Sequence, residues 1–139
     1  LGMDGTHFCD STGLHNPDHY STAKDMAVLL QYALKNDTFR EIAESPWHST
    51  PGTNVHPDGI TYYSTMFTNL SDPSVTGGKI LGGKTGFTNA AGSCLASFAE
   101  IEGVEYILVT AGAMDGGTPN ITDAVTVYNR LGEAAQALK

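Results

Sequence analysis

The stretch KILGGKTGFTNAAGSCLASFAEIEGVEYILVTAGA, residues 79–113, decides the fold of this chain of 139 residues. It contains three β-prone or apolar segments separated by short turns, one of them around Gly103. The continuous apolar run Tyr106–Val109 is typical of a buried strand. Because short turns connect antiparallel neighbours, the stretch predicts a three-stranded antiparallel sheet.

Helices are predicted on both sides of this sheet in the sequence. Before it, apolar residues recur at helical spacing at Met26, Leu29, Leu30, Ala33 and Leu34. A short second helix is capped by Asn36 or Asp37. A long helix follows the sheet from Pro119, and Gly132 weakens it by about 1 kcal/mol relative to alanine. The fold class is therefore α+β, three antiparallel strands with flanking helices.

The remaining segments are predicted to be mostly irregular. Residues 1–20 are rich in Gly, Asp, His and Asn, which favours loops. Residues 45–66 contain three prolines and a β-prone ITYYSTM, which predicts loops with a hairpin.

The composition is that of a globular protein, with 40% hydrophobic and 16% charged residues. The net charge is −8, from 15 acidic and 7 basic residues, so nucleic-acid phosphates and anionic membrane surfaces would repel the chain. No apolar run approaches the roughly 18 residues of a membrane-spanning helix. The carboxylates Asp115, Asp123 and Glu133 are expected on a solvated surface.

The triplet Lys84-Thr85-Gly86 carries the candidate chemistry. A lysine supplies a positive charge for a substrate carboxylate, and the threonine hydroxyl beside it can hydrogen-bond the same anion. A glycine lets a ligand backbone lie against the strand as an added strand would. The backbone N–H of Phe87 can then meet a developing oxyanion. The triplet alone is frequent by chance, so its context decides its meaning.

Two stretches together resemble a known family. Residues 82–113 resemble the third-motif strand and the next two strands of the serine D-alanyl-D-alanine carboxypeptidases, the low-molecular-mass penicillin-binding proteins. Residues 1–34 resemble a loop-and-helix segment of the same family, with a Phe-x-Asn-x-x-Gly-Leu core. Here the core is Phe8, Asp10, Gly13 and Leu14, so an aspartate replaces the usual asparagine. The two stretches cover about half of the chain.

The resemblance implies an incomplete penicillin-binding, β-lactamase-like (transpeptidase-like) domain. Residues 1–139 would be its C-terminal portion, with a helical and loop part over 1–66 and the Lys-Thr-Gly strand, two further strands and a helix over 67–139. The full enzyme would trim peptidoglycan stem peptides through an acyl-serine and be inhibited by β-lactams. It would need no cofactor or metal and would act outside the cytoplasmic membrane, in the cell envelope.

The resemblance also implies roles for single residues. Lys84 and Thr85 would bind the terminal carboxylate of a D-Ala-D-Ala stem peptide or of a β-lactam, and Gly86 would allow its close approach. These three residues would form the part of the catalytic site that this chain carries. The Phe87 N–H would be half of the oxyanion hole.

Ser21 to Lys24 has the Ser-x-x-Lys spacing of the family's nucleophile, in which the lysine takes the serine proton. The family also needs a Ser-x-Asn, and none begins at any serine between residues 45 and 74. Thr22 and Asp25 instead form a capping pair typical of a helix start. We therefore expect the nucleophile to lie outside this chain and the chain alone to be inactive.

Two alternatives stay open for the function. A β-lactamase of the same superfamily would carry the same strand, although the segment HFCDSTGL…YSTAKDMA favours the carboxypeptidase. A non-catalytic module could use the sheet to bind a peptide or protein. Ser-x-x-Lys and Ser-x-Asn motifs upstream in the full-length gene product would indicate an enzyme.

The family's sheet contains two further strands from the N-terminal part of the domain. Without them, the last strand here would be an edge, and an uncovered apolar edge invites pairing with another chain. We therefore predict self-association through Tyr106–Val109, or association with the N-terminal part.

Cysteine and histidine give weaker signals. Cys9 and Cys94 are each predicted to be buried free thiols, with a disulfide between them as the alternative. His15 and His19 have the spacing of a zinc site on a helix, but Pro17 favours a loop and a third ligand is missing, so no metal site is expected.

Overall fold

The computed structural model describes residues 1–114 and 117–139; Asp115 lies outside them. The first half contains α1 (Ala23–Ala33), α2 (Asp37–Glu44), β1 (Trp47–Ser49), β2 (Thr61–Tyr63) and α3 (Thr65–Asn69). The second half contains β3 (Ser74–Val75), β4 (Gly78–Thr88), β5 (Gly92–Ile101), β6 (Val104–Ala113) and α4 (Pro119–Ala137).

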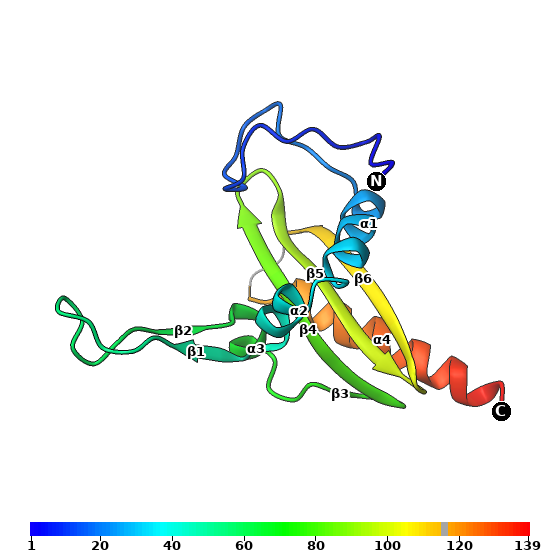
Figure 1. The fold of residues 1–139 in the computed structure, drawn as a ribbon. Coiled ribbons are helices and arrows are strands. Elements are labelled where there is room, and N and C mark those ends of the chain that lie inside the picture. Colours follow the sequence, from blue (N-terminus) through cyan, green and yellow to red (C-terminus); the bar gives the residue numbers. More distant parts are fainter. Residues whose placement is uncertain (115–116) are drawn as a thin grey trace.

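The four strands β3-β4-β5-β6 form one antiparallel sheet in that order, with helices on both faces (Figure 1). The side chains of β5 alternate between two cores. Leu95, Ala99 and Ile101 pack with α3 and α4, whereas Phe98 packs with Leu30 of α1 and with Leu34, the residue that caps this helix. The predicted α+β class is confirmed, and the short β3 adds one strand to the three predicted.

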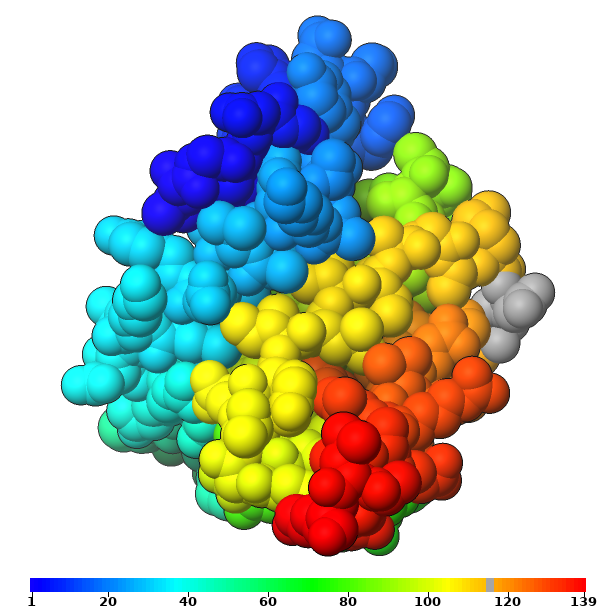
Figure 2. Space-filling view, turned by 90° about the vertical axis from the view of Figure 1, so that its right-hand side faces the viewer, coloured from blue at the N-terminus to red at the C-terminus, as the bar shows by residue number. Residues whose placement is uncertain are grey.

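The turn predicted around Gly103 is confirmed and has a specific geometry. Ile101 pairs with Val104, so only Glu102 and Gly103 lie between the strands. Their φ angles are 50° and 76°, as a type I′ hairpin turn requires at both central positions. The twist of this turn matches that of β5 and β6. In the strand order, β6 lies at the edge of the sheet. Figure 2 shows β6 (yellow) at the surface between the N-terminal helices and α4.

The helix starts follow the predicted caps. Thr22 Oγ1 accepts a hydrogen bond from Asp25 N at 3.0 Å, and Asn36 Oδ1 accepts one from Phe39 N at 2.9 Å. The buried Asp25 carboxylate also accepts from Gly5 N at 2.9 Å and from Thr6 Oγ1 at 2.7 Å. The start of α1 therefore anchors the N-terminal loop, and the predicted helix start at Thr22 is confirmed.

The predicted hairpin in residues 45–66 is confirmed as a projecting arm, β1 and β2 with the loop between them (Figure 1). Thr50 N donates to Ile60 O at 2.9 Å, and Thr50 Oγ1 accepts from Ile60 N at 3.0 Å. Further along the loop, His56 N donates to Thr53 Oγ1 at 3.0 Å. The arm is therefore ordered by its own hydrogen bonds.

The N-terminal loop is irregular as predicted, with one isolated bridge between His7 and Tyr20. Cys9 is exposed on this loop, so the prediction that it is buried is wrong. Cys94 is half-buried, and both thiols are free. His15 and His19 lie outside any helix, and no three potential metal-ligating side chains gather among the described residues.

The acidic residues that the structure describes on α4, Asp123 and Glu133, are exposed as expected. Within the described ranges, no helix has the length and apolar character needed to cross a membrane.

Candidate functional site

The Lys-Thr-Gly segment, Lys84–Gly86, lies on β4 beside an open strand edge. On one side, Lys84, Thr85 and Gly86 face Ala96, Leu95 and Cys94 of β5 in register. On the other side, β3 pairs with β4 only at residues 78 and 79. Beyond that point, no described strand pairs with this edge of β4. An unpaired edge presents backbone donors and acceptors to an extended peptide.

The alternation of the ladder sets the direction of the Phe87 backbone. Ile101 closes a two-residue turn, so its backbone groups, and those of every second residue before it, point toward β6. Ser93 is one of these residues and faces Phe87. Phe87 therefore directs its N–H away from β5, toward the open edge. A hydrogen bond on the same side of β4 supports this direction: Ile80 N donates to Pro73 O at 2.8 Å. The bulge after Ile80 accounts for the change from even to odd residue numbers between Ile80 and Phe87.

The glycines around the segment have different structural reasons. A β-carbon at Gly82 would lie 2.4 Å from the carbonyl oxygen of Ala43, at the end of α2. At Gly83 it would lie 2.6 Å from Ala96 O. Packing within the chain therefore accounts for both. At Gly86 a β-carbon would meet nothing within 4 Å, so the space beside this glycine is open.

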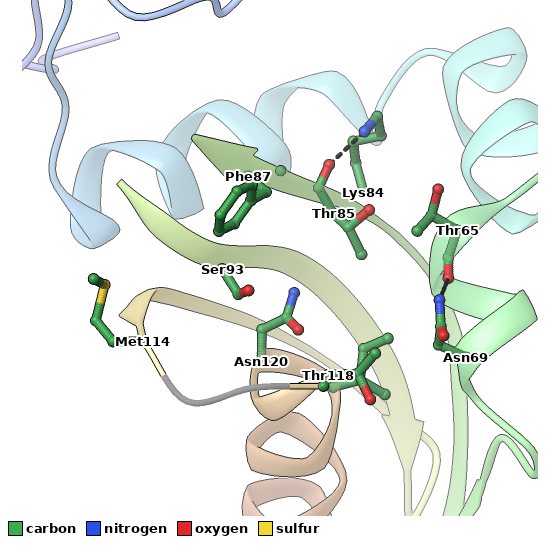
Figure 3. Close-up of a pocket in the computed structure, with 12 residues that line it drawn as sticks. Thr65, Asn69, Lys84, Thr85, Phe87, Ser93, Met114, Thr118 and Asn120 are labelled. Atoms are coloured by element: carbon green, nitrogen blue, oxygen red, sulfur yellow. Dashed lines mark hydrogen bonds between the residues drawn. The ribbon is translucent and has the colours of Figure 1, made fainter. Parts of the chain in front are cut away.

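A cavity of about 630 Å³, here called the KTG pocket, lies next to this segment (Figure 3). Besides residues 84–87, it is lined by Thr65, Asn69, Ser93, Met114, Gly117, Thr118, Asn120 and Ile121. Lys84 is the only charged side chain in the lining that the structure describes. It is exposed, and its Nζ donates to Thr85 O. The pocket thus combines one exposed cation with several neutral hydrogen-bonding groups, which suits an anionic group on a ligand.

The sequence did not predict the far wall of the pocket. Asn69 comes from α3 and donates its Nδ2 to Thr65 O at 2.8 Å. Asn120 comes from the first turn of α4 and donates its Nδ2 to Cys94 O at 2.8 Å. The sequence predicts a helix that starts at Pro119, but only the packing of α3 and α4 on the sheet brings these side chains to the pocket.

Ser21 does not line this pocket. It precedes α1, and its Oγ lies 2.8 Å from Thr6 Oγ1. The sequence-predicted residues Lys84, Thr85, Gly86 and Phe87, in contrast, all line the KTG pocket.

The family model for D-alanyl-D-alanine carboxypeptidase matches residues 1–115. The D-alanyl-D-alanine carboxypeptidase of Streptomyces sp. (strain K15) is 28% identical over 129 residues, which cover 93% of this chain and 43% of that protein. The D-alanyl-D-alanine carboxypeptidase DacB2 of Mycobacterium tuberculosis is 28% identical over 133 residues, with the same two shares, 93% and 43%.

Solved structures show the same likeness. A serine-to-alanine mutant of the Streptomyces DD-transpeptidase matches with a TM-score of 0.75 and 25% identity, covering 93% of this chain and 48% of that one. The D-alanyl-D-alanine carboxypeptidase from Mycobacterium tuberculosis matches with a TM-score of 0.70 and 24% identity, covering 91% and 47%. The chain thus has the fold of the penicillin-binding DD-peptidases, as a partial domain that spans less than half of these relatives. The match over residues 1–115 shows that it belongs to the D-alanyl-D-alanine carboxypeptidase family.

Proposed function

We propose that this chain is the carboxylate-binding part of a serine D-Ala-D-Ala carboxypeptidase whose nucleophile lies outside residues 1–139. The observation that carries the proposal is the open space at Gly86, on an unpaired strand edge beside the only described cation of the pocket. A peptide can lie there only because residue 86 has no side chain.

In the proposed complex, the terminal carboxylate of the stem peptide binds Lys84 Nζ and Thr85 Oγ1. The peptide backbone passes over Gly86, and the carbonyl of the scissile bond meets the N–H of Phe87. A serine from the rest of the domain attacks this carbonyl carbon while a lysine accepts the serine proton. The C–N bond then breaks, the leaving D-alanine amine takes the proton, and water hydrolyses the acyl-serine. Phe87 N–H stabilises the oxyanion formed in both steps.

The wider role follows from this substrate. D-Ala-D-Ala stem peptides belong to peptidoglycan, so the full enzyme acts outside the cytoplasmic membrane, in the cell envelope. A β-lactam carries a carboxylate and a reactive carbonyl, so it occupies the same groups and acylates the serine. The chain alone lacks the nucleophile and is inactive. The open edge of β6 at Tyr106–Val109 associates with the rest of the domain or with a second copy.

Labelling with a fluorescent penicillin tests this proposal. The full-length gene product is expected to carry covalent label on a denaturing gel, whereas the 139-residue chain carries none. In the longer protein, Lys84→Ala removes a charged hydrogen-bond donor and should slow acylation by about ten- to a hundredfold. Lys79→Ala is the matched control, because Lys79 is exposed on the same strand where β3 covers the edge.

Three results would contradict the proposal. Label on the short chain that disappears in Ser21→Ala would make Ser21 the nucleophile. Penicillin hydrolysis without a lasting acyl-enzyme would indicate a β-lactamase. A full-length product without Ser-x-x-Lys and Ser-x-Asn motifs would indicate a non-catalytic binding module.

A further inference from the structure

Asn120 is a buried polar residue of the KTG pocket to which the proposed reaction gives no role. It is only 5% exposed and lies in the first turn of α4. Its Nδ2 donates to Cys94 O of β5 at 2.8 Å, and Figure 3 shows this nitrogen directed toward the strand. Burial of an amide group is unfavourable unless it forms hydrogen bonds, so the contact with Cys94 fixes the side chain in place.

Cys94 is the residue of β5 that faces Gly86 of the Lys-Thr-Gly segment. Every second residue of β5, counted back from Ile101, directs its backbone groups toward β6, so Cys94 directs its own toward β4. In an antiparallel ladder, the Cys94 carbonyl oxygen therefore accepts from the N–H of Gly86. The same oxygen has a second lone pair, which accepts from Asn120 Nδ2. Asn120 and Gly86 thus share one backbone acceptor.

The sheet supports Cys94 poorly from the side of β6. The two neighbours of Cys94 in β5 pair with Ala113 and Thr110, so residues 111 and 112 both lie opposite Cys94. Gly112 has a φ of 76°, a conformation typical of such a bulge. Because a bulge bends the strand and interrupts the ladder, the hydrogen bond from α4 supplies a support for Cys94 that β6 does not.

Phe87 follows Gly86 directly, and the N–H groups of these two residues point to opposite sides of β4. The inward hydrogen bond of Gly86 therefore sets the place of the outward N–H of Phe87. We propose that Asn120 is a positioning residue for the Phe87 N–H, acting through Cys94 O and Gly86. This inference rests on the proposed function, in which that N–H stabilises the oxyanion. A donor of this kind is effective only when it is held in place before the reaction.

Penicillin acylation of the full-length gene product tests this role, with the dissociation constant of penicillin and the rate constant of acylation measured separately. Asn120→Ala is expected to slow acylation about tenfold, less than the roughly hundredfold or greater loss that follows removal of an oxyanion donor. The effect is smaller because the Phe87 N–H is displaced rather than removed. The dissociation constant should change little, because Lys84 and Thr85 still bind the carboxylate.

Asn129→Ala is the matched control for the attachment of α4. Asn129 also ties this helix to the rest of the protein, since its Oδ1 accepts from Thr76 N at 2.8 Å. It does not line the KTG pocket. The Asn129→Ala variant should therefore lose stability in urea unfolding but keep the original rate constant of acylation.

Asn120→Asp keeps the shape of the side chain and separates the hydrogen bond from packing. An ionised carboxylate cannot donate to Cys94 O, whereas a protonated carboxyl can. Burial also raises the pKa of a carboxyl above its ordinary value of about 3.9. The rate constant of this variant, divided by that of the original protein at the same pH, should therefore rise as the pH falls from about 7.5 to about 5. The ratio cancels the titration of groups that both proteins contain.

Three results would overturn the role of Asn120 and leave the carboxypeptidase proposal intact. They are acylation of Asn120→Ala at the original rate, equal slowing in Asn129→Ala, and a rate ratio for Asn120→Asp that does not change with pH. If circular dichroism shows that Asn120→Ala does not fold, the ratio for Asn120→Asp decides alone. Absence of penicillin labelling in the original full-length product would overturn both proposals.

Discussion

Gly132 of α4 lies against the backbone of Thr76 in the turn between β3 and β4. A β-carbon at residue 132 would be 1.8 Å from the carbonyl oxygen of Thr76. One turn earlier on the same helix face, Asn129 Oδ1 accepts hydrogen bonds from Thr76 N at 2.8 Å and from Thr76 Oγ1 at 3.0 Å. The helix and the turn therefore meet backbone to backbone, which only glycine allows.

Gly132→Ala should destabilise the protein, although the same change stabilises an isolated helix by about 1 kcal/mol. The new methyl group must displace a carbonyl that Asn129 holds, and overpacking of this kind costs about 1–3 kcal/mol. Urea unfolding measures the change in the free energy of unfolding. Ala134→Gly, at an exposed position of α4, is the control. It should lower the free energy of unfolding only by the difference in helix propensity, about 1 kcal/mol. A Gly132→Ala variant more stable than the original chain would contradict the close approach of Gly132 to the Thr76 carbonyl.

A buried hydroxyl pair joins α4 to the middle of the sheet. Ser97 Oγ lies 3.1 Å from Tyr128 OH, and the two residues are 0% and 1% exposed. Tyr128→Phe should cost about 0.5–1.5 kcal/mol, because the hydrogen bond is lost while the ring still fills its space. Urea unfolding of the variant at pH 7 measures this. A loss above about 3 kcal/mol would indicate disrupted packing instead.

The same pair predicts a loss of stability at alkaline pH. Burial raises the pKa of Tyr128 from 10.0 to about 12. The unfolded state ionises first, so the contribution of Tyr128 is complete below pH 10 and is lost as the pH rises to about 12. Unfolding free energies measured across this range should fall less steeply in Tyr128→Phe. Parallel curves for the two proteins would contradict the assignment.

An ion pair fixes α2 to β6 on the other face of the sheet. Arg40 Nη1 and Nη2 donate to Glu105 Oε2 and Oε1 at 2.8 and 3.0 Å, and the guanidinium lies 5.3 Å from the Phe98 ring centroid. The Arg40 guanidinium lowers the pKa of the Glu105 carboxyl. The ion pair therefore stabilises the folded state fully above the unfolded-state pKa of Glu105, about 4.3. This stabilisation is lost as the pH falls through the lower pKa that Glu105 has in the folded state.

Glu105→Gln should lower the free energy of unfolding at pH 7 by up to about 1 kcal/mol, since both side chains are about one third exposed to solvent. The variant should also lose less stability than the original chain between about pH 5 and 3. Thermal or urea unfolding at these pH values checks both effects. Glu133→Gln, an exposed carboxylate on α4, is the control for the change in net charge.

The features that the sequence predicted depend on local chemistry. The caps at Thr22 and Asn36, the turn at Gly103 and the strands of residues 79–113 are specified by residues close to one another in the chain. The segment Lys84–Gly86 was found for the same reason.

The features that it missed depend on tertiary contacts. The wall of the KTG pocket at Asn69 and Asn120 forms only when α3 and α4 pack on the sheet. A helix pattern predicts only a weak point at Gly132, because it cannot show a carbonyl that approaches from Thr76. A second cavity, between α2 and the arm, likewise brings together residues from separate segments of the chain.

The open edge of β6 gives the last prediction. Residues 106–109 are only half-buried, and no described strand covers this edge of the sheet. By the alternation set at the Ile101–Val104 turn, Val109 directs its N–H outward. The chain should therefore dimerise at high concentration in light scattering. Val109→Pro should weaken this association, because it removes one outward donor at an edge position where proline is tolerated.

Circular dichroism controls for the folding of the Val109→Pro variant. The N-terminal part of the full-length product, added in trans, should compete with the dimer if it completes the sheet at this edge. A chain that stays monomeric at millimolar concentration, with or without that part, would contradict pairing through β6. Dimers that persist in a folded Val109→Pro variant would likewise contradict pairing through β6.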